Sequence, residues 1–573
     1  MIVGIDLGTS TSEIAYIDES GKVIVIPNRN NELITPSVVH IKENGRAIVG
    51  EEAGEYLFTR PECTFMEIKR RFGTNEKYMV HGKVYSPEEI QAHIIEYLVD
   101  CAEDYTGEDV TGAVITVPAY FTDIQRKQTI KAGTLAGIDV KRVINEPTAA
   151  AMDYGLANMS ECENILVYDF GGGTLDVTVL ELFEGVIDVK SSFGNNLLGG
   201  KDFDEALMKH IAGSNYRKLM ADPKAKMKLK QAATACKIAL SSDESTVVRL
   251  PLITESLSID CKVTRSDFEN LIRPMVESTG EQIDTALKDA GLTPDNLQRV
   301  ILVGGTTRVP LVREFVEKKL GVVTQHQDDR DRSPELMVVR GAAIQAAIIE
   351  GVIGEEQSVV LTDVCPFTLG MKVATNRGFI VDPLIRRNVT IPYKFSKVYT
   401  AMFEYQEAIN VEIYQGESSR THENTLIGSL MLDKLPKRKD ELAKAEVTFS
   451  YDVSGVLGVT ARSLGNDKTV STEIDINQED IVVRPPVRLA DWVHADGSAK
   501  HRPLLKKAQK LIDEFIDDDE FIDRGLYVLL HYCDDLKAAL ISGNKEDIEE
   551  KAESLKKALP VFENDVRHWE RYL

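Results

Sequence analysis

Two stretches of the chain share one pattern of apolar and polar positions: a short apolar run, a turn of small residues, and then alternation. In residues 165–180, ILVYDFGGGTLDVTVL, the apolar run leads to Asp169. Residues 2–17, IVGIDLGTSTSEIAYI, place Asp6 and Gly8 in the same layout. A buried run followed by period-two alternation predicts two strands joined by a turn. We therefore predict an internal repeat, with one hairpin in each of two similar lobes.

Each predicted hairpin puts a carboxylate where a buried strand ends and a loop with little side-chain cover begins. Glycine leaves successive main-chain N–H groups free to surround an anion, and a carboxylate beside them can hold Mg²⁺ or its water shell. Either stretch alone is also typical of an ordinary hairpin with a glycine-rich turn. Because both occur in one chain, we interpret them as facing phosphate loops that hold a nucleotide between the lobes.

Strands and helices alternate through the first 355 residues, which favours an α/β fold. A helix is expected over residues 86–105, where Ser86 and Glu89 form a capping box before apolar positions at helical spacing. Further helices are expected at residues 123–136, 149–154, 224–240 and 334–350.

Two glycine pairs follow in the second lobe. Gly304-Gly305 ends the buried run 300–303 and opens a helix, which makes it a natural nucleotide contact. Gly199-Gly200 precedes Lys201 as in the end of a P-loop, but Asp202 stands where that motif needs a hydroxyl residue. We therefore reject a P-loop at this position.

The pattern changes near residue 355. A polar stretch leads into Val359-Val360-Leu361, and because linkers are normally polar, this apolar run suggests a segment that can dock. Over residues 364–476, short alternating strands replace helical periodicity, which predicts a small antiparallel β domain. Helical patterns return from His501, with breaks expected at residues 542–544 and at Pro560.

Composition narrows the class of function. The 573 residues carry a net charge of −24, which argues against nucleic acid or an anionic membrane as the main partner. The seven cysteines are scattered without a C-x-x-C pair, which favours reduced thiols over disulfides or a zinc site. No apolar run approaches the ~18 residues of a membrane span. Because Met1 leads directly into a strand, we expect a cytoplasmic chain without a signal peptide.

Nine segments, in order, resemble the DnaK-type heat-shock chaperones, the 70-kDa heat-shock protein family. They are GIDLGTSTS (4–12), EIKRRFG (67–73), VITVPAYF (114–121), RVINEPTAAAMDYG (142–155), VYDFGGGTLDVTVL (167–180), LGGKDFD (198–204), VILVGGTTRVP (300–310), LTDVCPFTLG (361–370) and VEIYQGE (411–417). The compact first domain and the short C-terminal part resemble the short HscC-like branch of that family more than the full-length form. The resemblance implies an actin-like α/β ATPase domain of two similar lobes at 1–355, a linker at 356–363, a peptide-binding β-sandwich at 364–476 and a short helical lid at 477–573.

The resemblance also implies roles for individual residues. Phosphate and adenosine contacts are expected from Gly8, Thr9, Ser10, Thr11, Gly172, Gly173, Thr174, Gly199, Gly200, Lys237, Ser241, Gly304, Gly305, Thr306 and Arg308. Catalytic roles are expected for Lys69, Glu146, Asp169 and Thr174, and Mg²⁺ contacts, largely through water, for Asp6 and Asp169. Residues expected to relay the nucleotide state are Pro118, Arg126, Arg142, Leu361 and Asp363. The expected peptide groove consists of Met371, Val373, Tyr399, Met402, Ile409 and Val411.

Together these matches imply an ATP-driven chaperone that binds extended apolar segments of unfolded proteins. They imply ATP or ADP with Mg²⁺ as cofactor, leave K⁺ open, and imply a J-domain co-chaperone, with a nucleotide exchange factor as a further candidate partner. Thr234 departs from the family, which usually places a glutamate against the ribose. The repeated lobes alone also fit a small-molecule kinase or a filament protein, which the β region at 364–476 disfavours. For Val411, the alternative is an ordinary core position.

Overall fold

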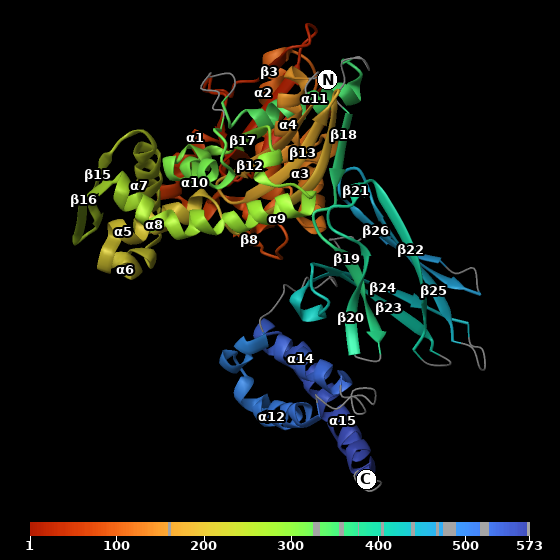
Figure 1. Ribbon diagram of the computed structural model, residues 1–573. Helices are drawn as coiled ribbons and strands as arrows, with labels where there is room; N and C mark the ends of the chain where they lie inside the picture. The colour runs from red at the N-terminus through yellow and green to blue at the C-terminus, as the bar shows by residue number, and fades with distance from the viewer. Residues whose placement is uncertain are drawn as a thin grey trace. The chain divides into compact units, whose positions relative to one another are not determined.

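A computed structural model describes residues 1–158, 162–324, 333–353, 360–375, 378–402, 406–436, 442–465, 469–473, 489–515 and 527–569. The chain divides into two compact units, which are described separately here (Figure 1). Unit 1 comprises Met1–Pro366 with the short segment Val453–Val456, and unit 2 comprises Phe367–Asp452 and Leu457–Leu573.

Unit 1 contains two sheets, and four strands of each repeat one order. The first sheet runs β11-β10-β1-β2-β3 and the second includes β17-β12-β13-β14-β18, so that β10-β1-β2-β3 corresponds to β17-β12-β13-β14. In each sheet the first hairpin strand, β1 or β12, pairs antiparallel with its hairpin partner and parallel on its other side. The strands are β1 (Ile2–Leu7), β2 (Thr11–Ile17), β3 (Val23–Val25), β10 (Gly112–Val117), β11 (Asp139–Asn145), β12 (Cys162–Phe170), β13 (Leu175–Phe183), β14 (Val186–Asn195), β17 (Arg299–Val303) and β18 (Val360–Val364). The predicted repeat of two hairpins, β1–β2 and β12–β13, is confirmed. We call the parts built on the first and second sheets the first and second lobes.

The predicted helices of unit 1 are present. Ser86 and Glu89 form the capping box of α2, and Thr122 with Gln125 forms one for α3. Helix α4 begins earlier than predicted, at Glu146, because a proline in its first turn suits a helix start. The helices are α1 (Glu51–Thr59), α2 (Pro87–Thr106), α3 (Asp123–Leu135), α4 (Glu146–Ala157), α5 (Gly200–Ala212), α6 (Tyr216–Met220), α7 (Pro223–Ser242), α8 (Arg265–Ser278), α9 (Gly280–Ala290), α10 (Pro310–Leu320) and α11 (Met337–Glu350).

Short strands and 3₁₀ turns complete unit 1. Three small strands form a sheet in the first lobe, a two-stranded ribbon lies beside it, and another ribbon belongs to the second lobe. The short strand β4 (Thr35–Pro36) pairs with β2 of the first sheet. The strands of the small sheet and the two ribbons are β5 (Val38–Ile41), β6 (Ala47–Val49), β7 (Thr64–Met66), β8 (Tyr78–Val80), β9 (Lys83–Tyr85), β15 (Ser245–Thr254) and β16 (Leu257–Thr264), and the 3₁₀ turns are η1 (Pro61–Cys63), η2 (Ile68–Arg71), η3 (Gly213–Asn215), η4 (Pro294–Asn296) and η5 (Gly305–Arg308).

Each lobe has its own apolar core, and a third core lies between the two sheets, where α4 and α11 pack together. Small residues make this packing possible. A Cβ at Gly341 of α11 would overlap the backbone of Ala149 of α4, and a Cβ at Gly4 of β1 would overlap the backbone of Ala343. The centre of unit 1 is therefore main chain packed against main chain.

The apolar linker segment adds a strand to the second sheet. Strand β18 pairs in parallel with β14, so that Leu361 lies opposite Ile187. Leu361 packs partly against the core between the sheets, and Asp363 is buried, but Val360 keeps 55% of its surface exposed. Val359 lies outside the described residues. Docking of this segment therefore rests on main-chain pairing and Leu361 more than on burial of every apolar side chain.

Unit 2 begins with two antiparallel sheets of the predicted alternating strands, in the orders β20-β19-β23-β24 and β22-β25-β26-β27. Strand β24 approaches β26 and β27, which brings the sheets face to face around buried Ile413, Val447 and Phe449. The elements are β19 (Leu369–Thr375), β20 (Gly378–Ile385), β21 (Thr390–Ile391), β22 (Tyr393–Thr400), β23 (Ala408–Gln415), η8 (Thr421–Glu423), β24 (Thr425–Asp433), β25 (Lys444–Tyr451), β26 (Leu457–Leu464) and β27 (Thr469–Glu473).

The helical part of unit 2 comprises η9 (Leu489–His494), α12 (Ser498–Phe515), α14 (Tyr527–Ser542) and α15 (Lys545–Trp569). The predicted break at residues 542–544 is confirmed, with Gly543 at a positive φ of 73°. The predicted break at Pro560 is wrong, because α15 continues through it. Leu559 and Phe562 are buried on either side, so packing holds the helix despite the main-chain hydrogen bond that proline cannot donate.

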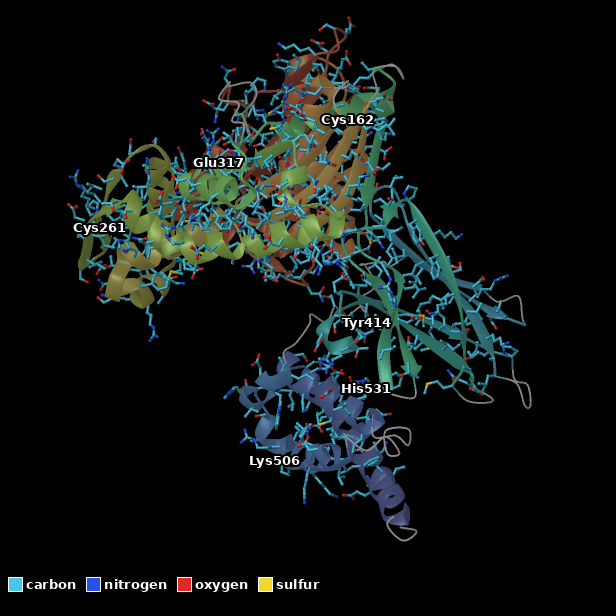
Figure 2. The ribbon with its side chains drawn as sticks, in the orientation of Figure 1. Cys162, Cys261, Glu317, Tyr414, Lys506 and His531 are labelled. Atoms are coloured by element: carbon cyan, nitrogen blue, oxygen red, sulfur yellow. The ribbon has the colours of Figure 1, made fainter. Side chains whose placement is uncertain are left out.

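All seven cysteines are free thiols, as the sequence predicted, and Cys162 and Cys261 lie at opposite ends of unit 1 (Figure 2). Among the described residues, no helix has both the length and the apolar character needed to cross a membrane.

Candidate nucleotide site

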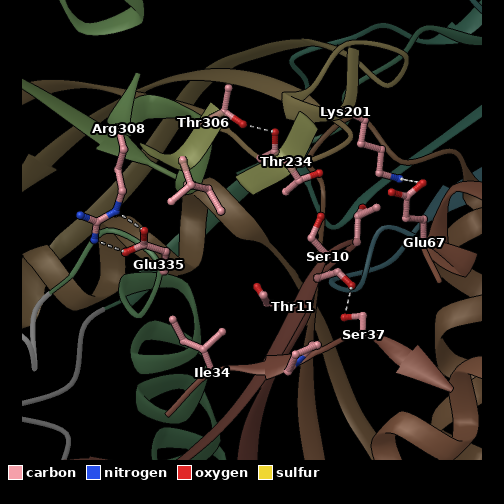
Figure 3. A pocket seen from close by; sticks show the side chains of 18 of the residues that line it. Ser10, Thr11, Ile34, Ser37, Glu67, Lys201, Thr234, Thr306, Arg308 and Glu335 are labelled. Atoms are coloured by element: carbon pink, nitrogen blue, oxygen red, sulfur yellow. Dashed lines mark hydrogen bonds and ion pairs between the residues drawn. The ribbon is translucent and has the colours of Figure 1, made fainter. Parts of the chain in front are cut away.

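A cavity of about 1350 Å³ lies between the two lobes of unit 1 (Figure 3). Both hairpin turns, α7 and the Gly304 turn contribute to its wall. The predicted site residues that line it are Asp6, Gly8, Thr9, Ser10, Thr11, Glu146, Asp169, Gly172, Thr174, Lys237, Ser241, Gly304, Gly305, Thr306 and Arg308. The remaining predicted residues of this site, Lys69, Gly173, Gly199 and Gly200, contact residues of the wall without lining it.

The tips of the two hairpins meet at the cavity. A Cβ at Gly172 would overlap the hydroxyl of Ser10, and one at Gly173 would come within 3.3 Å of Thr9. The main-chain N–H of Gly171 donates to the carbonyl of Thr174 at 3.0 Å and closes the second turn. Glycine therefore suits the second tip, because side chains of the first tip occupy the space in front of it.

The start of α5 supports the second turn from behind. The N–H of Gly200 donates to the carbonyl of Gly171, and the N–H of Lys201 donates to that of Gly172, both at 3.1 Å. The Asp202 carboxylate accepts from the N–H of Gly199 at 2.7 Å and so caps the helix. This role explains why the stretch has an aspartate where a P-loop has a hydroxyl residue.

Buried carboxylates gather beneath the hairpin tips. Asp6 Oδ1 accepts from Thr116 Oγ1 at 2.6 Å, whereas Asp169 Oδ2 is buried and has no hydrogen-bond partner among the described residues. Burial raises the pKa of Asp6 to about 7, and nearby Glu146 adds to the shift. The same two causes raise the pKa of Asp169 well above its ordinary value. A cation in this place would stabilise the ionised carboxylates.

The carboxylates fit a hydrated metal ion better than one held directly. In the described part of the chain, no three His, Cys, Asp or Glu side chains converge closely enough to ligate a metal together. Mg²⁺ keeps several waters and commonly uses one or two carboxylates together with substrate phosphates. Asp6 and Asp169, with the unpartnered Asp169 Oδ2, suit such an ion.

Lys69 is buried beside these carboxylates. Its Nζ lies 2.7 Å from Glu146 Oε1 and 5.3 Å from the centre of the Phe121 ring. Only 2% of the Lys69 side chain is exposed, and Glu146 begins α4. The pair places one fixed positive charge next to the carboxylates.

Lys237 and Arg308 lie on the second-lobe side of the cavity. Lys237 Nζ donates to the carbonyl of Gly200 at 3.0 Å and pairs with Asp204 at 2.8 Å. The Arg308 guanidinium pairs with Glu335 through two hydrogen bonds, one of them from Nη2 to Oε2 at 2.7 Å (Figure 3). This end therefore offers a planar cation and polar groups that suit a nucleoside.

Comparison with known proteins identifies the family. The profile of the Hsp70 protein family matches residues 2–570. The chain belongs to the Hsp70 family. Chaperone protein DnaK of Thermotoga petrophila is 43% identical over 481 residues, which cover 82% of this chain and 79% of the relative. Chaperone protein DnaK of Thermosipho melanesiensis is 42% identical over 494 residues, which cover 84% and 82%.

As a member of the Hsp70 family, the chain is an ATP-dependent chaperone and an ATPase. The family binds ATP and ADP, generally with Mg²⁺. The kinase and filament alternatives are not favoured. The predicted likeness to the short HscC-like branch stays a prediction, since both relatives above carry the name DnaK.

The predicted relay residues of this Hsp70 chain cluster around Asp363 in unit 1. Asp363 Oδ2 accepts from Asn145 Nδ2 at 2.9 Å and from Thr148 Oγ1 at 3.2 Å. Arg126 Nη2 donates to Asn145 Oδ1 at 2.6 Å and to a carbonyl of the turn after Pro118 at 3.0 Å. Arg142 donates to Gln345 of α11 at 3.0 Å, and its charge, like that of Arg126, opposes the rise that burial causes in the pKa of Asp363.

The predicted groove residues of unit 2 differ in exposure. Met402 is exposed, Val373 and Ile409 are half-buried, and Tyr399 donates a hydrogen bond to Asp382 at 2.7 Å. Val411 has no exposed surface, and Met371 is also buried. Ile409, Val411 and Ile413 share one face of β23, as their spacing predicts. The burial of Val411 is what the core alternative predicts.

Sequence reasoning missed a charged group at the cavity wall. Glu67 of the first lobe pairs with Lys201 at 2.8 Å and with Lys230 at 2.7 Å, and all three residues line the cavity. Thr234, noted only as a departure from the family, donates to Asp204 at 3.0 Å. The sole sequence signal for Lys201 was its place after Gly199-Gly200, which the P-loop spacing argued against.

Proposed function

We propose that MgATP occupies the cavity with its phosphates between the two hairpin tips and its adenosine toward Arg308. The tips supply main-chain N–H groups and the hydroxyls of Thr9, Ser10, Thr11 and Thr174. The observation that carries this placement is the close approach of the two tips, where a Cβ at Gly172 would overlap the hydroxyl of Ser10. Main-chain N–H groups and hydroxyls, which bind anions, are therefore the groups that the tips present there.

In this arrangement the chain's own groups orient the reaction. Mg²⁺ would neutralise charge on the phosphates, held through water by Asp6 and Asp169. Lys69 and Glu146 would hold the attacking water in line with the γ-phosphate, and Thr174 would donate to the phosphate from the turn. The site also accommodates K⁺ in the proposal, since Asp176 is a further buried carboxylate nearby whose pKa burial raises to about 7.

We further infer that the linker reports the nucleotide state through Asp363. Asp363 is hydrogen-bonded to Asn145, and Asn145 immediately precedes Glu146, the partner of Lys69. A shift of Glu146 with the γ-phosphate would therefore disturb the contacts that hold β18 on the sheet. Such coupling must be reciprocal, so a peptide that favours release of β18 would alter ATP turnover.

Two neighbouring linker residues allow a matched test. Leu361→Asp would place a charge against the core between the sheets, whereas Val360→Asp changes a side chain that is already more than half exposed. We expect Leu361→Asp to abolish stimulation of ATP turnover by peptide while leaving basal turnover near normal, and Val360→Asp to keep stimulation. If both variants retain stimulation, or if the unmodified chain shows none, the proposed coupling through the linker is wrong.

We also propose that extended apolar peptides bind to the sheet of unit 2 that contains β23. Ile409 and Val373 would contact the peptide directly, with Tyr399 and Met402 beside them and with Met371 and Val411 forming the floor. Peptide main chain can pair with a sheet edge while side-chain pockets set specificity. Few acidic residues are expected in good ligands because the chain is strongly acidic.

Phenylalanine substitutions at neighbouring positions test the groove. Ile409→Phe should weaken peptide binding with a nearly unchanged unfolding midpoint, because its side chain is only half-buried. Val411→Phe should lower stability by about 1–3 kcal/mol through overpacking. Peptide affinity and thermal unfolding of the full chain measure both. Unchanged peptide affinity in Ile409→Phe would move the peptide site elsewhere.

The proposal extends to the partners and the location of the chain. A J-domain co-chaperone would meet the surface near Arg126 and Pro118, and a nucleotide exchange factor would act on the second lobe. A cytoplasmic location accords with seven free thiols. The domain limits 1–355, 356–363, 364–476 and 477–573 stay predictions.

A further inference from the structure

Lys201 lies at the phosphate end of the cavity without a role in the assignments above. Its main-chain N–H donates to the carbonyl of Gly172, so its backbone is fixed to the second hairpin tip. Its side chain lines the cavity and is 9% exposed. Figure 3 shows it reaching toward Glu67, well away from the Arg308–Glu335 pair. An ammonium group is therefore held next to the turn on which phosphates are proposed to bind.

The Lys201 ammonium has hydrogen-bonding capacity to spare. It lies 2.8 Å from Glu67 Oε2, and the described residues supply no further well-aligned acceptor. An ammonium group carries three donors, so most of them are unused in this buried place. Burial, with smaller contributions from Arg70 and Lys230, lowers the pKa of Lys201 to about 8 against the opposing effect of Glu67. A second anion beside the ammonium group would stabilise its charged form, which burial disfavours.

Glu67 can release Lys201 without losing its own counter-charge. Its other oxygen, Oε1, lies 2.7 Å from Lys230 Nζ on α7. Two lysines keep the pKa of Glu67 below its ordinary value despite burial. If Lys201 turned toward a phosphate, Glu67 would remain paired with Lys230. Neither carboxylate nor ammonium would then be left buried and unpaired, which is the costly outcome in such exchanges.

We propose that Lys201 is a phosphate-positioning residue that exchanges its pairing with Glu67 for the polyphosphate of the bound nucleotide. This inference rests on the proposed nucleotide site and adds a residue to it. The phosphate gains a charge-assisted hydrogen bond from the second lobe. Glu67, from the first lobe, holds Lys201 ready while the cavity contains no nucleotide, and it competes with the phosphate for the same ammonium.

Two substitutions in the full chain distinguish this exchange from a simple ion pair between the lobes. Lys201→Met should weaken MgADP binding about tenfold, the size of one lost charge-assisted hydrogen bond, and leave adenosine binding unchanged. Glu67→Gln removes the competitor and should leave MgADP affinity equal to or higher than that of the unmodified chain. Lys209→Met is the matched control, because Lys209 lies on the same helix, pairs with Glu205 and is exposed. It should change neither affinity.

Proton uptake gives a second readout that a purely structural role would not alter. Near pH 8, a phosphate that binds Lys201 favours its charged form, so MgADP binding should take up protons and weaken as the pH rises further. Calorimetry in buffers of different ionisation enthalpy measures this uptake, which Lys201→Met should reduce. The charged residues facing Lys201 are Glu67, Arg70 and Lys230. The control Lys209→Met changes none of them and should retain uptake.

Several results would overturn the inference. If Lys201→Met and Glu67→Gln weaken MgADP and adenosine alike, the pair only joins the lobes. If Lys201→Met leaves MgADP affinity unchanged, Lys201 does not contact phosphate. Should Lys201→Met fail to fold, Lys201→Gln replaces it, and a loss of MgADP affinity in Glu67→Gln would still contradict competition. Failure of the unmodified chain to bind MgADP would instead refute the proposed site itself.

Discussion

The two hairpins of unit 1 share one layout but contribute different chemistry to the cavity. The first tip, Gly8–Thr11, carries three hydroxyl side chains, and the second, Gly171–Thr174, presents the main chain of three glycines and the single hydroxyl of Thr174. The carboxylates differ in the same sense: Asp6 has one oxygen bound by Thr116, whereas Asp169 Oδ2 has no hydrogen-bond partner in the described structure. The repeated hairpin thus provides two similar walls of the cavity, and the different side chains at corresponding positions make the two walls complementary.

This comparison predicts that the hairpins bind phosphate while the chemical step depends on a residue outside both. Lys69→Ala should lower single-turnover ATP hydrolysis by more than about a hundredfold, yet keep ATP affinity within about tenfold. The reason is that Lys69 faces Glu146 behind the wall rather than lining the cavity. Affinity and hydrolysis should be measured on the same preparation.

Lys131→Ala serves as a control for Lys69→Ala, because Lys131 also pairs with a buried glutamate, Glu88, but lies far from the cavity wall. It should leave hydrolysis unchanged. Near-normal hydrolysis in Lys69→Ala would show that Lys69 takes no part in the chemical step. The step would then depend on residues of the hairpins.

The two aspartates test the asymmetry directly. Asp169→Asn should weaken Mg²⁺-dependent ADP binding about tenfold more than Asp6→Asn, because the free oxygen of Asp169 has more to offer a hydrated cation. Titrating Mg²⁺ at fixed ADP for both variants measures the difference. Equal losses would show that the cation does not distinguish the hairpins.

The contact between the tips predicts a smaller effect. Gly172→Ala should weaken MgADP binding about fivefold, because the new methyl group would push the Ser10 hydroxyl aside. Ser10→Ala leaves a Cβ 3.4 Å from that methyl position, an ordinary contact. In the double variant, Gly172→Ala should therefore cost less than it does alone, and strict additivity of the two changes would contradict a direct contact.

The smallest expected effect is on stability. The buried Asp6 and Asp176 have pKa values raised to about 7, so the folded state holds protons more tightly than the unfolded chain. Their stabilisation is present at low pH and is lost as the pH rises through about 7. From pH 6 to 7.5, the unfolding transition of unit 1 should fall by about 3 °C without Mg²⁺. MgADP should flatten this dependence, and an equal slope with MgADP would place the cation elsewhere.

Much of this fold followed from local patterns in the sequence. The hairpins were predictable because apolar runs, Asp6 and Asp169, and glycine turns lie within short stretches. Helix α2 was predictable from the Ser86–Glu89 capping box. The predicted break at Pro560 was wrong because burial of its neighbours outweighed the lost main-chain hydrogen bond. Such packing depends on residues distant in sequence, which local patterns do not show.

The parts of the site that could not be predicted are those assembled across long sequence separations. Glu67 meets Lys201 and Lys230 only because the lobes face each other, and no spacing rule connects these positions. The burial of Val411 likewise depends on a second sheet, whereas its alternation along β23 was evident. Local patterns therefore predicted the hairpins that form the cavity walls. The contacts between the two walls could be identified only from the folded structure.

The tight contact of Gly341 with Ala149 has a mechanical consequence. Where even a methyl group does not fit, two helices have little freedom to slide, but they can still turn about their point of contact. In a rotation about the α4–α11 contact, residues far from the contact would move more than residues close to it. A small rotation there would widen the cavity most on the side farthest from these helices, so a change too slight to disturb the core could be enough to let a nucleotide leave.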